Sequence, residues 1–280
     1  MNKIKSLAFN YGLFAVLSIA LILGGAFFEP SYAKDKNDDK IIKLAVTNLK
    51  VYEDTAKAWA KEVEKLGYKL DYRIISGVQL NESLERGEVF ANYHQHTPAL
   101  TEFNRTHKGH IVPAFPVFTD RSGLFSLKYK NIKDLPVGAK IVIPADVGNN
   151  FRTFQILADA GLIKIKSGVP SESVSKADII DNPKKFKFVE VEYELLERTI
   201  KDADAGFLYA TNAAQIGLDF NKDVLWPEPE KFWAADIIAV REENLKSPKT
   251  EILKKAYYTE AVKQALKDAF DGREILLPAW

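Results

Sequence analysis

Two short segments of the sequence carry the side chains best suited to bind a small ligand. The first reads Ala-Asn-Tyr-His-Gln-His-Thr-Pro from Ala91 to Pro98 and joins an apolar run to a segment with helical spacing. A strand that passes directly into a helix places Tyr93, His94 and His96 near its carboxyl end, where α/β proteins bind small molecules. The N-terminus of the following helix favours negative charge. We therefore expect these three side chains to form part of a binding-site wall.

The histidines also allow a metal-binding hypothesis. All four lie between His94 and His110, and His94 and His96 are two residues apart, so in an extended segment both would share a face. Such a pair could chelate zinc or manganese. The spacing fixes no third ligand, and we expect structural or surface roles for His107 and His110. Binding and delivery of zinc or manganese is therefore the alternative function, and the leading hypothesis has no metal ligand.

The second candidate segment runs from Ile143 to Arg152. It reads Ile-Pro-Ala-Asp-Val-Gly-Asn-Asn-Phe-Arg, again a strand followed by a loop and the start of a helix. An arginine one turn into a helix can direct its planar guanidinium at a carboxylate, and the helix dipole reinforces that contact. The same arginine could instead form a surface ion pair with Asp146 or Asp159. Asn149 could cap the helix, contact a ligand, or do both.

Composition excludes several classes of protein. A chain of 280 residues with 46% hydrophobic residues can form one large domain or two ordinary ones. The absence of cysteine excludes a disulfide scaffold, a Cys-based zinc site and a cysteine nucleophile. A net charge of +1 removes the electrostatic case for binding nucleic acid. Because no G-x-S-x-G elbow, P-loop or G-x-G-x-x-G loop is present, we expect no enzymatic activity and no cofactor.

The N-terminus has the pattern of an export signal. Basic residues precede an almost wholly apolar run from Tyr11 to Phe28, and Ser-Tyr-Ala follows Pro30. This order predicts a signal peptide over residues 1–33 with cleavage after Ala33. The long apolar run leaves an uncleaved membrane anchor as the alternative. The mature chain would be formally neutral, and a periplasmic location is expected.

The candidate segments are embedded in two units of alternating strands and helices. In the first unit we expect strands at 41–46, 70–74, 89–93 and 111–118, and helices at 52–66, 80–86 and 98–107. In the second unit we expect strands at 123–127, 140–143, 186–191, 205–209 and 236–240. Its expected helices are at 150–160, 194–201 and 249–270, and we expect the segment 164–182 to be mainly loop. The alternation predicts parallel pairing with right-handed crossovers. Two such units predict two lobes with a ligand cleft between them.

Several motifs resemble the NlpA-type lipoprotein family, which includes the methionine-binding components of ABC importers. They are Asn92–Pro98, Ile143–Arg152, Ala-Gly-Leu-Ile-Lys from Ala160, Asn-Pro-Lys from Asn182, Ile-Gly-Leu from Ile216 and the closing Pro-Ala-Trp. The similarity spans about residues 41–280. It implies an α/β, two-lobed, type II periplasmic-binding-protein-like fold with two chain crossings and a C-terminal helix that returns to the first lobe. We accordingly predict lobe 1 at 34–120 plus 236–280, lobe 2 at 121–235, and hinges near 118–123 and 225–236.

The resemblance also implies functional residues. Asn149 and Arg152 are retained, as are Gln95 and His96, and Arg152 would hold the α-carboxylate of an amino acid. Four pocket positions depart from the family pattern: His94 replaces Phe, Gly77 replaces Tyr, Tyr209 replaces Asn and Asn212 replaces Tyr. The family's hinge motif Ser-Pro-Tyr-x-Asn reads Phe-Trp-Ala-Ala-Asp here, which introduces Trp233 and Asp236. The cysteine that carries the family's lipid anchor is absent.

These observations predict a solute-binding protein that delivers an amino acid to the permease and ATPase of an ABC importer by hinge closure. Methionine is the ligand by resemblance. A more polar or cationic amino acid, or a short peptide, is the alternative, because the changed positions make the pocket more polar. The expected state is a monomer that binds no nucleic acid. The expected ligand-binding residues are Tyr93, His94, His96, Asn149, Arg152, Tyr209, Asn212, Trp233 and Asp236.

Overall fold

The alternation of apolar strands and amphipathic helices builds two separate β-sheets in the computed structural model, which describes residues 38–77, 79–273 and 275–280. The six strands of the first sheet have the spatial order β13-β4-β12-β3-β1-β2. Their bounds are β1 Ile41–Thr47, β2 Lys69–Ile75, β3 Ala91–His96, β4 Ile111–Asp120, β12 Asp236–Arg241 and β13 Leu276–Pro278. β1 pairs in parallel with β2 and β3, whereas β12 runs antiparallel to both β3 and β4.

The second sheet has five strands in the order β11-β5-β10-β6-β9. Their bounds are β5 Ser122–Phe125, β6 Lys140–Pro144, β9 Lys187–Val191, β10 Ala205–Tyr209 and β11 Val224–Pro227. β6 is parallel to β9 and β10, and β5 is antiparallel to β10 and β11. A small antiparallel pair, β7 (Lys164–Ile165) and β8 (Ile179–Asp181), lies beside this sheet.

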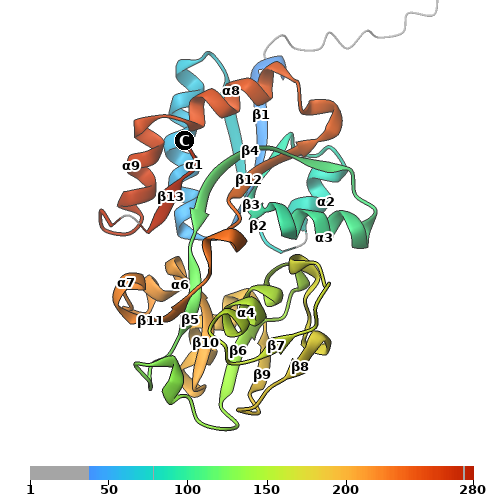
Figure 1. The fold of residues 1–280 in the computed structure, drawn as a ribbon. Coiled ribbons are helices and arrows are strands. Elements are labelled where there is room, and N and C mark those ends of the chain that lie inside the picture. The colour runs from blue at the N-terminus through green and yellow to red at the C-terminus, as the bar shows by residue number, and fades with distance from the viewer. Residues whose placement is uncertain (1–37, 78, 274) are drawn as a thin grey trace, which may run out of the picture. The chain divides into compact units, whose positions relative to one another are not determined.

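Each sheet has its own helices, and we call each sheet with its helices a lobe (Figure 1). The helices of the first lobe are α1 (Lys50–Lys65), α2 (Gln79–Glu85), α3 (Thr97–His107), α8 (Pro248–Tyr257) and α9 (Glu260–Asp268). Those of the second lobe are α4 (Val147–Asp159), α5 (Leu196–Thr199), α6 (Ala210–Gln215) and α7 (Phe220–Asp223). α8 and α9 pack on α1, so the chain ends in the first lobe.

The chain passes between the sheets at two places. β4 ends at Asp120 and β5 begins at Ser122, so a single residue joins the two sheets there. The return passage runs from the end of β11 at Pro227 to the start of β12 at Asp236. The strands of the first sheet thus come from 41–120 and 236–278, and those of the second from 122–227. This distribution supports the lobe boundaries expected from the sequence, which remain a proposal.

Three features of the fold differ from the sequence-based expectations. The helix expected at 249–270 is two helices, because the Thr259 side chain accepts a hydrogen bond from the Val262 backbone N–H and begins a new helix there. The helix expected at 150–160 begins three residues earlier, at Val147. The expectation of parallel pairing is wrong near the crossings: β12 is antiparallel to β3 and β4, β13 is antiparallel to β4, and β5 is antiparallel to β10 and β11.

The predicted signal peptide at 1–33 lies outside the described residues. Within the part of the chain that the structure describes, none of the helices is long and apolar enough to cross a membrane.

Candidate ligand-binding site

A cavity of about 460 Å³ lies between the two lobes, at the carboxyl ends of parallel strands. From the first lobe, β1 and β3 end at the cavity with Thr47 and His96. From the second, β10 ends there with Tyr209, and Asp146 and Glu192 follow β6 and β9. Carboxyl ends of parallel strands are where α/β folds bind ligands, because the loops there diverge and the helix N-termini converge. The cavity is therefore the candidate site.

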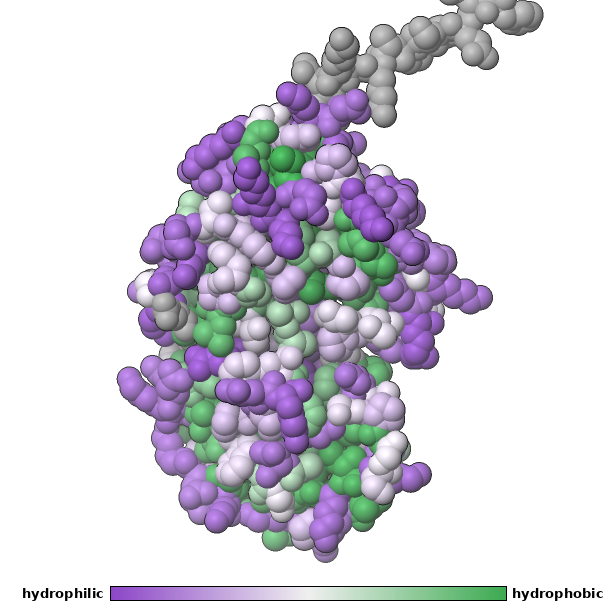
Figure 2. Space-filling model, turned by 45° about the horizontal axis from the view of Figure 1, so that its top comes forward, coloured by the Kyte–Doolittle hydropathy of each residue, from purple (hydrophilic) through white to green (hydrophobic). Residues whose placement is uncertain are grey.

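The charged groups around this cavity are unbalanced. Six lining residues are acidic: Glu102, Asp120, Asp146, Glu192, Glu194 and Asp236. Among the described residues, no lysine or arginine lines the cavity, and the only basic side chains there are those of His94 and His96. Figure 2 shows one face of the molecule, where hydrophilic side chains form much of the outline and the surface narrows between the lobes. The interior of the cleft is thus acidic.

Two of these carboxylates lie where the chain crosses between the lobes. Asp120 ends β4 and Asp236 begins β12, a neighbouring antiparallel strand. Burial raises the pKa of Asp236 to about 6. Burial and repulsion by Asp236 raise the pKa of Asp120 to about 7. We call Asp120 and Asp236 the acidic pair.

The two cavity histidines are neutral. Burial lowers the pKa of His94 to about 3, with a smaller contribution from His96. Burial and the nearby Arg152 charge lower the pKa of His96 to about 4. The His96 Nδ1 accepts a hydrogen bond from the Ala99 backbone N–H at 3.2 Å, so its Nε2–H donates to Asn149 Oδ1 at 2.7 Å. Neither imidazole neutralises the acidic residues of the cavity.

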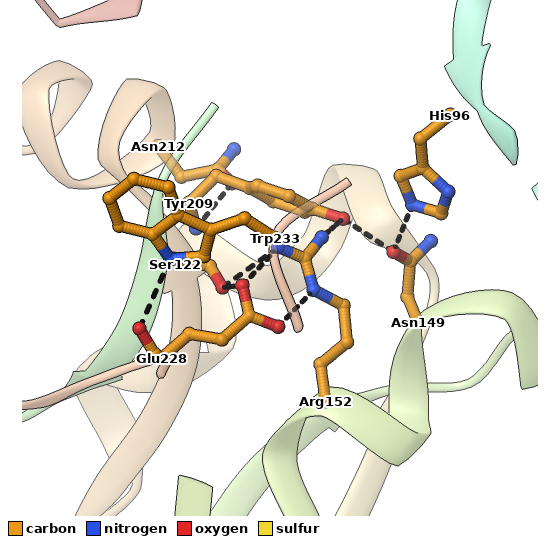
Figure 3. A network of polar contacts seen from close by, with 8 residues as sticks. All are labelled: His96, Ser122, Asn149, Arg152, Tyr209, Asn212, Glu228 and Trp233. Carbon is orange, nitrogen blue, oxygen red and sulfur yellow. Dashed lines mark hydrogen bonds and ion pairs between the residues drawn. The ribbon is translucent and has the colours of Figure 1, made fainter. Parts of the chain in front are cut away.

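A polar network continues from His96 into the second lobe (Figure 3). Asn149 Oδ1 also accepts a hydrogen bond from the Tyr209 hydroxyl, and Asn149 Nδ2 donates to Asp146 at 2.9 Å. Arg152 Nη1 donates to the Tyr209 hydroxyl oxygen at 2.7 Å, and its guanidinium lies 4.8 Å from the centre of the Tyr209 ring. His96 and Asn149 thereby join β3 of the first lobe to α4 of the second.

The network ends in a buried ion pair between Arg152 and Glu228. Arg152 is only 1% exposed, and both carboxylate oxygens of Glu228 accept hydrogen bonds from it, Oε1 from Nε at 2.7 Å and Oε2 from Nη2. Ser122 also accepts from Nη2, at 3.2 Å, and donates to Glu228 at 2.9 Å. The positive charge of Arg152 is therefore matched by a protein carboxylate.

Five of the nine residues expected from the sequence line the cavity: His94, His96, Asn149, Tyr209 and Asp236. The other four do not. Arg152 lies behind Tyr209, in the ion pair with Glu228. Tyr93 turns to the α1 side of β3, where its hydroxyl contacts that of Tyr257 at 2.8 Å, because successive strand side chains face opposite ways.

The remaining two expected residues support the second lobe and the return crossing. Asn212 lies in α6, where its amide donates to Glu197 at 2.8 Å and its oxygen accepts from the Tyr209 backbone N–H at 3.3 Å. Trp233 donates its Nε1–H to the Glu228 backbone oxygen at 3.1 Å and lines a separate cavity against Phe115 and Pro116. Both side chains are engaged away from the candidate site.

Several cavity residues are not among those expected from the sequence, and Asp120 is the most informative of them. An acidic residue at the end of the apolar run 111–118 was the available signal, because strand ends share one edge of the sheet. Tyr52 and Tyr193 were also missed, since their positions at the start of α1 and after β9 are decided by how the lobes meet. Glu228 gave no local signal, because it is 76 positions from its partner.

The metal alternative gains no support. Among residues 38–77, 79–273 and 275–280, no three His, Cys, Asp or Glu side chains are grouped so that they could hold a metal ion. The His94 Nε2 instead lies 3.2 Å from Asn81 Oδ1, and both nitrogens of His96 have protein partners.

The chain is similar to known binding proteins in sequence and in fold. The model of the NlpA lipoprotein family matches residues 42–280. The D-methionine-binding lipoprotein MetQ of Salmonella typhi is 31% identical over 271 residues, which cover 95% of this chain and 98% of that protein.

Solved structures have the same fold. A nutrient-binding protein from Burkholderia cenocepacia, solved with bound methionine, is 30% identical with a TM-score of 0.78, and the match covers 85% of this chain and all of that one. A periplasmic substrate-binding protein of an ABC transporter from Coxiella burnetii is 29% identical with a TM-score of 0.77, over 85% of this chain and all of that one. The predicted two-lobed, periplasmic-binding-protein-like fold is confirmed.

Proposed function

The chain belongs to the NlpA lipoprotein family, and we propose on that basis that it binds an amino acid between its lobes for delivery to an ABC importer. The observation that carries this proposal is the cavity of about 460 Å³ formed by strand ends from both lobes. Its relatives are binding proteins, and the Burkholderia cenocepacia protein holds methionine. A cavity of this size is within the range of small-ligand sites.

The polar network suggests how the α-carboxylate is held. Tyr209, Asn149 and His96 line the cavity near the N-terminus of α4, and the ligand carboxylate would replace Asn149 Oδ1 as the acceptor of the Tyr209 O–H and the His96 Nε2–H. Arg152 reaches the ligand through Tyr209, because its Nη1–H polarises the hydroxyl that faces the cavity. Arg152 is therefore a positioning residue, and the direct contact with the carboxylate expected from the sequence is reassigned to Tyr209.

Hinge closure is the proposed mechanism. Only two crossings join the sheets, so the lobes can rotate about Arg121 and the segment 228–235. The bond between His96 and Asn149 spans the cleft, and a Cβ on Gly148 of α4 would lie only 3.1 Å from the Ala99 Cα of α3. Because glycine permits this close approach, the described arrangement corresponds to a closed cleft.

We also propose where the protein is located and which partners it has. The relative from Coxiella burnetii is a periplasmic protein of an ABC transporter. We place this chain in the periplasm as well, released from its signal near Ala33, as a monomer that docks on a permease coupled to an ATPase. The absence of cysteine removes the usual attachment point for a lipid anchor.

Titration calorimetry of the purified protein against the twenty amino acids, each as both enantiomers, tests the proposal. We expect at least one amino acid to bind with micromolar affinity or better. The Tyr209→Phe variant should bind it about tenfold more weakly, because one hydrogen bond to a charged group is lost. Absence of heat with every amino acid would exclude an amino-acid ligand.

A further inference from the structure

The acidic pair, Asp120 and Asp236, belongs to the crossing between the lobes and lines the cavity there. Asp236 pairs with Phe118 on β4, and Asp120 is two positions farther along that strand. Both side chains line the cavity, and Asp236 is only 8% exposed. The pair therefore lies at the base of the candidate site.

From the residues that the structure describes, the acidic pair receives hydrogen bonds from neutral donors only. The Tyr52 hydroxyl donates to Asp236 Oδ2, while the hydroxyl and backbone N–H of Thr211 donate to Asp120. Among the described residues, no donor reaches Oδ1 of Asp236 within hydrogen-bonding distance, although the side chain lines the cavity. A buried carboxylate in this position has unused capacity to accept hydrogen bonds.

Neither the arginine nor the histidines provide the missing positive charge. Arg152 is the cation whose charge acts on both carboxylates, and Glu228 already offsets it through two hydrogen bonds. His94 and His96 are neutral at physiological pH. Burying carboxylates without a compensating cation is costly. The cavity without ligand is therefore electrostatically incomplete.

We propose that the ligand itself brings the missing charge, and that the cavity takes a basic amino acid whose side-chain ammonium or guanidinium lies against Asp120 and Asp236. This inference rests on the proposed amino-acid-binding function and specifies its ligand class. The ligand's α-carboxylate stays at Tyr209, Asn149 and His96. A basic amino acid carries two cationic groups and one carboxylate, so it leaves a net positive charge for the acidic pair.

The rest of the cavity wall suits a cation. Tyr52 and Tyr193 present aromatic rings to the cavity beside the acidic pair, and such rings attract ammonium and guanidinium groups. Asp146, Glu192 and Glu194 add negative charge on the second lobe. A methionine side chain would offer the acidic pair no hydrogen-bond donor, so we expect the site to favour a basic side chain over an apolar one.

The sharpest test compares lysine with norleucine, which has the same straight carbon chain without the terminal ammonium. We expect lysine, arginine or ornithine to bind the purified protein in calorimetry, and norleucine and methionine to bind at least about tenfold more weakly than the best of them. This comparison uses the unaltered protein, so it does not depend on whether a variant folds. Equal or tighter binding of methionine or norleucine overturns the inference.

Variants locate the cationic contact. Asp236→Asn and Asp120→Asn should each weaken binding of the basic amino acid by about tenfold or more and reduce the lysine-to-norleucine ratio. Asp71→Asn removes an exposed carboxylate on β2, outside the cavity lining, and should leave affinity unchanged. Unchanged lysine affinity in the folded double variant Asp120→Asn/Asp236→Asn overturns the assignment of the contact.

The two proposals fail in different ways. If a neutral amino acid binds and the basic ones do not, the proposed amino-acid-binding function stands and the basic-ligand inference fails. If no amino acid of any class binds, both fail.

Discussion

Two groups of buried charged residues lie within the same cleft region, and they differ in the signs of charge that they contain. The ion pair of Arg152 and Glu228 contains both signs of charge and satisfies itself with Ser122 and Tyr209. The acidic pair of Asp120 and Asp236 contains one sign only. The charge of Arg152 is offset by a carboxylate of the protein, whereas the acidic pair receives hydrogen bonds from neutral donors. On this difference we propose that the ion pair supports the site and that the acidic pair binds the ligand.

The same difference reverses the role expected of Arg152. A buried arginine close to a binding cavity resembles a ligand-binding group when only the sequence is considered. Because Glu228 accepts from Nε and Nη2 along one edge of the guanidinium, and Tyr209 accepts from Nη1, we propose that Arg152 positions Tyr209. The group that remains uncompensated is acidic, and this changes the expected ligand from one chosen for its carboxylate to one chosen for its cation.

The largest expected effect comes from breaking the ion pair. Arg152→Ala leaves the Glu228 carboxylate buried without a cation, and we expect the free energy of unfolding to fall by about 3–5 kcal/mol. Urea denaturation of the variant and the unaltered protein measures this loss. Arg86→Ala is the matched control, because Arg86 pairs with the exposed Glu88 and should contribute about 1 kcal/mol or less. A comparable small loss at Arg152 would contradict the structural role of the ion pair.

The acidic pair should respond in the opposite direction. Replacing both carboxylates, in Asp120→Asn/Asp236→Asn, should raise the free energy of unfolding of the ligand-free protein by about 1–3 kcal/mol at pH 8, because two uncompensated charges are removed from a buried site. The same urea experiment measures the gain. A loss of stability at pH 8 would show that the pair stabilises the fold and is not held for a ligand.

The pH dependence of that gain follows from the raised pKa values. Since the folded protein keeps protons on Asp120 up to about pH 7 and on Asp236 up to about pH 6, while the unfolded chain loses them near 3.8, the contribution of the pair to stability falls as pH rises from about 4 to 7. The advantage of the variant should therefore be small at pH 4 and greatest at pH 8.

Other titrating groups must be separated from this effect. His94 and His96 act with the opposite sign, because their lowered pKa values cost stability as pH falls below 6.5. They are common to both proteins, so the difference between the two pH profiles isolates the acidic pair. Tyr52, Tyr193 and Arg152 also lie in its electrostatic surroundings and do not change charge over this range. A difference independent of pH would contradict the raised pKa values.

The smallest expected effect comes from Tyr209, which links the ion pair to Asn149 at the cavity. Tyr209→Phe removes the hydroxyl that accepts from Arg152 and donates to Asn149, and should lower the free energy of unfolding by about 1 kcal/mol while the ion pair persists. Urea denaturation gives the stability change. Tyr129→Phe, a half-buried tyrosine distant from the cavity lining, is the control and should change stability less. A loss as large as that of Arg152→Ala would show that Tyr209 is essential to the ion pair.

Local patterning predicted most of the architecture and several contributors to the site. The strand ending at Tyr209 follows from its apolar run, whereas β3 continues past the expected end at Tyr93 to His96 and α4 begins before the expected start at Asn150. Helix capping sets the exact bounds of some helices. The Thr259 cap, for example, divides the C-terminal helical pattern into α8 and α9. Such features depend on neighbours within a few residues, which a sequence displays directly.

The sequence by itself determined the two α/β units, their family and the strand ends that form the cavity, because periodicity and motifs are local properties of the chain. Only the tertiary structure decided which buried charges are neutralised. Glu228 meets Arg152 across 76 positions, and Asp120 meets Asp236 because the chain leaves the first sheet after β4 and returns to it at β12. Electrostatic interaction depends on distance in space and on burial, and both are set by how the strands are ordered within the folded sheets.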